Sequence, residues 1–259
     1  MVEHYSTFVQ EEDIAQIAGA GLNWIRLPIP FWAIETWSDV GVDSDSTTPV
    51  AEPFLAKVCW EYILQILSWC RKYGIRVNLD LHAVPGSQNG LSFTLLMIYL
   101  LADAIDSQLG YNHSGKVGQI NFMNGIMGYA NAQRTLDYIR TITEFVTQAE
   151  YLDLVPMFSI VNEALLNTIG KEQMTSLYVL SCPPVPPSLI GFSISYLQAH
   201  DMIRSITGVG EGNGPFITIH DGFQSLGSWS GFLQGSDRIA IGKPRVTFDN
   251  SLCVYVLFR

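Results

Sequence analysis

The sequence predicts an α/β fold built on a parallel sheet, and two observations support this prediction. Short apolar runs of strand length alternate with longer segments in which apolar residues recur every three or four positions, as on one face of a helix. In the segment 75–82, apolar and polar residues alternate strictly, which is typical of a strand. Repeated strand and helix units of this spacing favour parallel pairing with right-handed crossovers, over five or six strands.

The first two helices are predicted from their ends. Acidic residues at 11–13 fit the first turn of a helix running toward Ala20, because negative charge is stabilised at a helix N-terminus. Pro53 is expected to open the second helix and Gly74 to end it, since proline is tolerated in the first turn and glycine after the last. The apolar positions of this second helix are Val58, Tyr62, Ile66, Trp69 and Tyr73.

The strands are expected between these and later helices. Strands are predicted at 24–28, 75–82, 155–162, 216–220 and 238–241, and further helices at 131–150 and 197–206. Central parallel strands are usually apolar on both faces. The polar face formed by Asn78, Asp80 and His82 therefore indicates a wet, functional interior.

Composition excludes several classes of function. The 259 residues are 48% hydrophobic and carry a net charge of −10 without a basic cluster, which argues against nucleic acid as a partner. The most apolar run, 91–104, is too short to span a bilayer. Cysteine and histidine spacings do not fit a metal site. Cys59 and Cys70 would lie roughly 16 Å apart on one helix, beyond disulfide reach. The first residues do not have the pattern of a signal peptide.

Polar residues at strand ends are the candidate catalytic groups, because α/β barrels place their active sites there. Arg26, His82, Asn162 and Glu163 have this position. Glycoside hydrolysis needs two carboxyl groups, one of which protonates the leaving oxygen, and Glu163 fits that role. Structural roles remain open for three of them: an ion pair or helix-cap neighbour for Glu163, an ion pair for Arg26, and a buried, hydrogen-bonded histidine for His82.

Six segments carry a resemblance to a known family. At barrel spacing the chain contains GLNWIRLPIPFWAIE, NLDLHAVPGSQNG and SIVNEALL, accompanied by YNHSGKVG, YLQAHDMIRSITG and IHDGFQSLGSWSGFL. Together they resemble the fungal exo-β-1,3-glucanase branch of glycoside hydrolase family 5. The resemblance implies a (β/α)8 TIM barrel, retaining exo-hydrolysis of β-1,3-glucan with release of glucose, and no cofactor or metal. The SQNG and HSG segments favour this branch over an endo-acting, cellulase-like one.

The resemblance also implies roles for single residues. Arg26 would brace the nucleophile, His82 would line the glucose subsite, Asn162 would contact the sugar 2-hydroxyl, and Glu163 would be the general acid/base. Two further residues would bind substrate: Tyr111, where the family usually has Phe, would offer an aromatic face near the subsite entrance, and His113 stands where the family has a glucose-contacting Asn. Trp229 and Phe232 fit either a sugar platform or core packing.

The chain also departs from the family pattern. It lacks the second Glu, which acts as the nucleophile, and Lys243 and Arg245 stand where the family has His and Tyr. The stretches at about 91–110 and 179–196 interrupt family motifs as insertions, either retained introns or genuine loops. We therefore expect one domain over 1–259, an incomplete barrel without its first and last strands that folds poorly.

Expectations about function follow from these departures. The chain is expected to be inactive, and the alternatives are a non-catalytic sugar-binding remnant or a misassembled gene product. The resemblance implies a β-glucan oligo- or polysaccharide as the partner, and an extracellular or cell-wall location. A monomer without a membrane span is expected.

Overall fold

The described part of the chain contains one parallel sheet. The computed structural model describes residues 2–39, 51–89 except 53, 120–171 except 126, residue 174, and 196–242 except 233. The strands are β1 (Trp24–Pro30), β2 (Arg76–Ala83), β3 (Met157–Ser159), β4 (Phe216–His220) and β5 (Ile239–Gly242). They pair in parallel and in chain order, β1-β2-β3-β4-β5. This is the arrangement of a partial (β/α)8 barrel, which confirms the predicted fold class.

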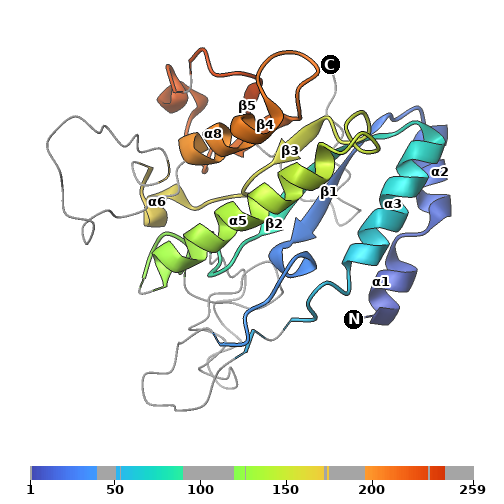
Figure 1. Cartoon of the computed structure of the whole chain (residues 1–259), viewed down its shortest axis with the longest axis horizontal. Helices are drawn as coiled ribbons and strands as arrows, with labels where there is room; N and C mark the ends of the chain where they lie inside the picture. The colour runs from blue at the N-terminus through green and yellow to red at the C-terminus, as the bar shows by residue number, and fades with distance from the viewer. Residues whose placement is uncertain are drawn as a thin grey trace, which may run out of the picture.

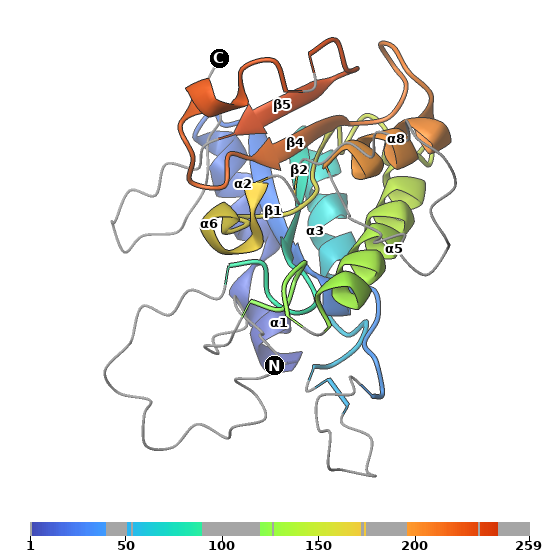
Figure 2. The ribbon, with the colours of Figure 1, turned by 90° about the vertical axis from the view of Figure 1, so that its left-hand side faces the viewer.

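A helix precedes each of the first four strands. These helices are α2 (Glu11–Gly19), α3 (Trp60–Tyr73), α5 (Gly128–Val146) and α8 (Tyr196–Thr207). Shorter elements are α1 (Val2–Phe8), α6 (Leu166–Ile169) and the 3₁₀ turns η1 (Phe31–Ala33) and η3 (Leu226–Trp229). Helices α3, α5 and α8 follow one another along one face of the sheet (Figure 1), and Figure 2 shows that face from the side. The pairs α2 with α3 and α5 with α8 pack together.

The second helix begins later than the sequence predicts. A start near Pro53 is wrong, because α3 begins at Trp60. Lys57 has φ 64°, a left-handed conformation that a right-handed helix cannot include. Gly74 ends the helix as predicted, with φ 70°. The buried face of α3 also differs from the predicted stripe, and consists of Ile63, Ile66, Leu67 and Cys70.

The third strand is shorter than predicted. It was expected over 155–162, but β3 covers only Met157–Ser159. Beyond it the chain still bonds to both neighbours. The backbone N–H of Ile160 donates to Thr218 O on β4, and that of Asn162 donates to Leu81 O on β2, each at 3.2 Å. The segment that carries the candidate site is thus fixed between two strands without being a strand itself.

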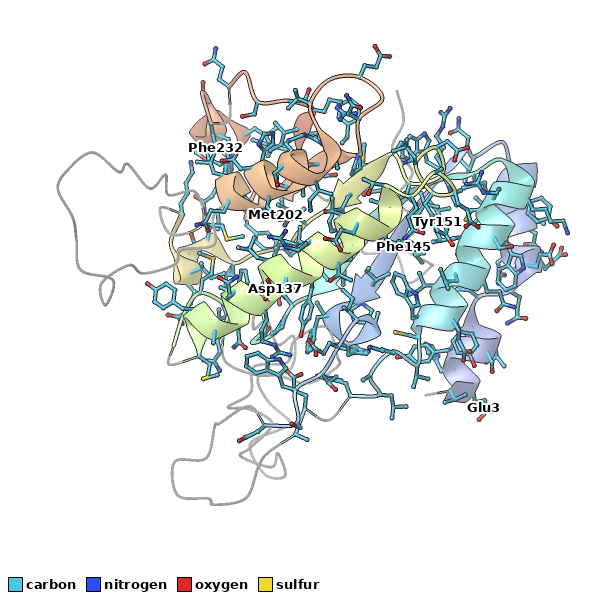
Figure 3. The ribbon with its side chains drawn as sticks, in the orientation of Figure 1. Glu3, Asp137, Phe145, Tyr151, Met202 and Phe232 are labelled. Carbon is cyan, nitrogen blue, oxygen red and sulfur yellow. The ribbon has the colours of Figure 1, made fainter. Side chains whose placement is uncertain are left out.

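The core fills the space between the sheet and its helices. Val77, Leu79 and Leu81 on β2 are fully buried, as is Cys70 on α3, which is a free thiol like Cys59. At the rim, Phe145 at the end of α5 packs on Tyr151, with ring centroids 4.2 Å apart (Figure 3). None of the helices in the described part of the chain is both long and apolar enough to span a membrane.

A buried ion pair ties the segment after β1 to α5. The Arg134 guanidinium donates from Nη1 and Nη2 to the two carboxylate oxygens of Glu52, both at 2.9 Å. Glu52 also accepts the backbone N–H of Trp37 at 2.7 Å, and the guanidinium lies 3.9 Å from the centre of the Trp37 ring. Removing one partner would leave a charge buried without compensation, which is costly.

The proposed insertions fall outside the described residues, apart from Tyr196. Tyr196 is the first residue of α8 and is buried, and its hydroxyl donates to His220 O at 3.3 Å. The insertions therefore stay predictions.

Candidate active site

The structure brings Arg26, His82 and Asn162 together around Asp80. Arg26 Nη2 lies 3.0 Å from Asp80 Oδ2, and His82 Nδ1 lies 2.7 Å from the same oxygen. Arg26 Nη2 also donates to Asn162 Oδ1 at 2.6 Å, while Asn162 Nδ2 faces His82 Nε2 at 3.4 Å. Four side chains from β1, β2 and the segment after β3 thus form one closed network.

The network follows from the register of the sheet. Asp80 and His82 project from the same face of β2, because alternate residues of a strand share a face. Arg26 was predicted at the end of a strand, and this is wrong. It is the third residue of β1, where it pairs with Asn78. Its long side chain reaches the site from there. Sequence reasoning placed Asp80 on the polar face of β2 but gave it no role.

Gln88 fixes the backbone of the site. It is fully buried, and its Nε2 donates to His82 O at 2.7 Å and to Asn162 O at 2.8 Å. The backbone carbonyl of Gln88 accepts the backbone N–H of Leu165 at 2.9 Å. The segments after β2 and β3 are therefore held together. Gln88 lies within the segment NLDLHAVPGSQNG, and that position was the only sequence signal for it.

Glu163 stands beside this network. Its side chain is half-buried, and its backbone has φ 48°, a left-handed conformation that turns the chain sharply after Asn162. Among the described residues, its carboxyl makes no hydrogen bond or ion pair. Burial raises the pKa of Glu163 above its ordinary value, with His82 and Arg26 opposing the shift and Asp80 adding to it. A carboxyl group with a raised pKa is suited to donate a proton.

The end of β4 faces the same interior. His220 is buried, and its Nδ1 accepts the N–H of Gly222 at 2.8 Å. Burial lowers the pKa of His220 to about 4, although Asp221 raises it, and the charges of Arg26 and Asp80 also act on it. Sequence reasoning missed His220, although it lies in the quoted segment IHDGFQSLGSWSGFL.

The remaining predicted residues fall into two groups. Tyr111 and His113 lie outside the described residues, so their roles stay predictions. Trp229 is 3% exposed and its Nε1 donates to Asp221 O at 3.0 Å, which supports core packing. Phe232 packs edge-on against it, with ring centroids 5.2 Å apart.

The described part of the chain has a cavity at some distance from this site. A cavity of about 670 Å³ lies at the opposite edge of the sheet, where Pro156, Phe216 and Arg238 stand at or before the starts of strands. We consider it unrelated to the catalytic candidates because none of them lines it. Within the described ranges, no three His, Cys, Asp or Glu side chains gather in a way that could hold a metal ion.

Comparisons with known proteins agree with the motifs. A protein named probable glucan 1,3-beta-glucosidase D from Aspergillus flavus is 30% identical over 250 residues, which cover 96% of this chain and 24% of that protein. Glucan 1,3-beta-glucosidase D from Emericella nidulans is 31% identical over 249 residues, or 96% of this chain and 23% of that protein. The chain thus spans about a quarter of the length of these curated relatives. No family model matches it.

Solved structures give weaker likenesses. A Pseudomonas stutzeri endoglucanase Cel5A has a TM-score of 0.43 at 17% identity and covers 90% of this chain and 50% of its own. Endo-glycoceramidase II from Rhodococcus sp. has a TM-score of 0.45 at 14% identity, over 90% and 51%. In sequence, nearly the whole chain is homologous to a part of the proteins named glucan 1,3-beta-glucosidase D.

Proposed function

We propose that the chain carries the glucose-binding and acid/base part of a retaining exo-β-1,3-glucanase site. The observation that supports this most is the closed network of Arg26, Asp80, His82 and Asn162 beside the half-buried carboxyl of Glu163. The names of the relatives supply the substrate class. An extracellular or cell-wall location, where β-glucan is found, is part of this proposal.

In this proposal Glu163 is the general acid/base. Burial raises its pKa above the ordinary value, which favours the protonated carboxyl that can donate a proton to the glycosidic oxygen as the bond breaks. In the second step the carboxylate takes a proton from the attacking water. Asn162 would donate to the sugar 2-hydroxyl, His82 would line the glucose subsite, and Arg26 would brace the nucleophile.

We also propose that the 259-residue chain by itself binds glucan without hydrolysing it. Retention needs a second carboxylate about 5–5.5 Å from the first, free to attack the sugar. Asp80 cannot act in this way, because it is 0% exposed and its Oδ2 is bound to Arg26 and His82. In the part of the chain that the structure describes, Asp80 is the only carboxyl group in the network beside Glu163.

Binding and turnover can be measured separately. Calorimetry with a β-1,3-linked glucose trisaccharide should show binding, while incubation with a soluble β-1,3-glucan should release no glucose. The β-1,4-linked trisaccharide serves as the ligand control. The exterior variant Arg71→Met serves as the protein control, because its partner Asp153 lies on the surface. If the chain binds both trisaccharides equally well, or binds neither, the proposed substrate class is wrong. Release of glucose would contradict the proposed lack of turnover.

A further inference from the structure

We propose that Asp80 is the positioning residue of this site: its buried Oδ2 fixes Arg26 and holds His82 with the hydrogen on Nδ1, and these two neighbours orient the Asn162 amide. The effect on sugar binding rests on the proposed function, whereas the effect on His82 does not. Asp80 is 0% exposed, so it cannot itself touch a sugar.

The first step concerns what holds Asp80. Its Oδ2 alone contacts both Arg26 Nη2, at 3.0 Å, and His82 Nδ1, at 2.7 Å. Its Oδ1 is buried and has no hydrogen-bond partner in the described part of the chain. Leaving one carboxylate oxygen without a partner costs free energy. We therefore explain this arrangement by the positions in which Oδ2 holds Arg26 and His82, and not by the stability of Asp80 alone.

The second step assigns the protons. A guanidinium only donates, so the atom of Asn162 that lies 2.6 Å from Arg26 Nη2 must be the amide oxygen. The amide nitrogen then faces His82 Nε2 at 3.4 Å. This nitrogen only donates, so Nε2 must accept and the ring hydrogen must sit on Nδ1, facing Asp80. With a hydrogen on Nε2 instead, two donors would face each other.

The third step concerns the consequence for the sugar. With Asn162 Oδ1 held by Arg26 and one hydrogen of Nδ2 directed at His82, the amide nitrogen keeps a second hydrogen to donate. A flipped amide would replace that donor by an acceptor. Asp80 therefore acts without contact to substrate, because it fixes Arg26 and His82, the two side chains that hold the amide in the orientation that can donate to a sugar hydroxyl.

Nitrogen NMR of the His82 ring tests the inference directly. In the unaltered chain at neutral pH, ¹⁵N shifts and couplings should show a protonated Nδ1 and an unprotonated Nε2. The opposite tautomer, or a mixture, would overturn the proposal, and this measurement does not depend on whether any variant folds. Asp80→Asn should shift His82 toward a mixture, whereas Asp221→Asn, which alters a buried carboxyl directly after β4, should leave His82 unchanged. Equal shifts in both variants would also overturn it.

Binding provides the second readout. Asp80→Asn should weaken binding of the β-1,3-linked trisaccharide by about tenfold or more, the size expected for losing a charge-assisted hydrogen-bond arrangement. If the unaltered chain binds no trisaccharide, the proposed function fails while the His82 tautomer still decides the role of Asp80. If the chain binds and Asp80→Asn, folded by circular dichroism, binds equally well, the positioning role is wrong.

Discussion

Because His220 is buried, we predict that the free energy of unfolding falls as the pH is lowered. Burial lowers the pKa of His220 from 6.5 to about 4. The unfolded chain therefore takes up a proton below about pH 6.5, while the folded chain stays neutral at this site until about pH 4. The stability tied to the neutral ring is fully present above pH 6.5 and is lost as the pH falls toward 4.

The magnitude follows from the size of the shift. One pKa unit corresponds to about 1.4 kcal/mol, so the full loss is on the order of 3 kcal/mol. Between pH 7 and pH 5 the loss amounts to about 2 kcal/mol, because only the unfolded chain titrates at this site in that range. Glu163 contributes with the opposite sign, since its pKa is raised. A comparison of variants that all retain Glu163 removes that contribution.

Urea unfolding at pH 7 and pH 5 measures the effect. His220→Asn keeps an acceptor for the Gly222 N–H but removes the titrating ring. The unaltered chain should lose about 2 kcal/mol more than this variant between the two pH values. His4→Asn, at an exposed position of α1, should behave like the unaltered chain. Parallel losses for His220→Asn and the unaltered chain would refute the reasoning.

Three further substitutions test other parts of the fold. Glu163→Gln should raise the melting temperature at pH 7 but not at pH 4, because burial disfavours only the charged carboxyl; an equal gain at both pH values would contradict this. Arg134→Met should cost about 3–5 kcal/mol in urea unfolding, against about 1 kcal/mol or less for Arg71→Met on the surface, and equal losses would show that burial is irrelevant. Gly86→Ala should cost at least about 2 kcal/mol more than Gly212→Ala. Both glycines have positive φ, but only at Gly86 would an added Cβ meet backbone atoms, at 2.6 Å; similar losses would exclude this clash.

Local signals in the sequence determined the elements and most of the candidate site. Apolar periodicity and end signals gave the order of helices and strands, the end of α3 at Gly74, and β4 at its observed bounds. Strand-end polarity and the motifs singled out Arg26, His82 and Asn162. These signals succeed because they depend on neighbours within a few residues, where helix and strand periods act.

Only the tertiary structure decided which of these side chains contact one another. Arg26 and Asn162 are 136 positions apart in the chain, and His82 and Asn162 are 80 apart. Asp80 becomes the shared partner of Arg26 and His82, and Asn162 joins those two, only because three neighbouring parallel segments bring them together. The late start of α3 likewise follows from the left-handed conformation of Lys57, which the apolar pattern does not encode. Which buried polar groups pair is set by distances across the sheet, and a linear pattern does not contain those distances.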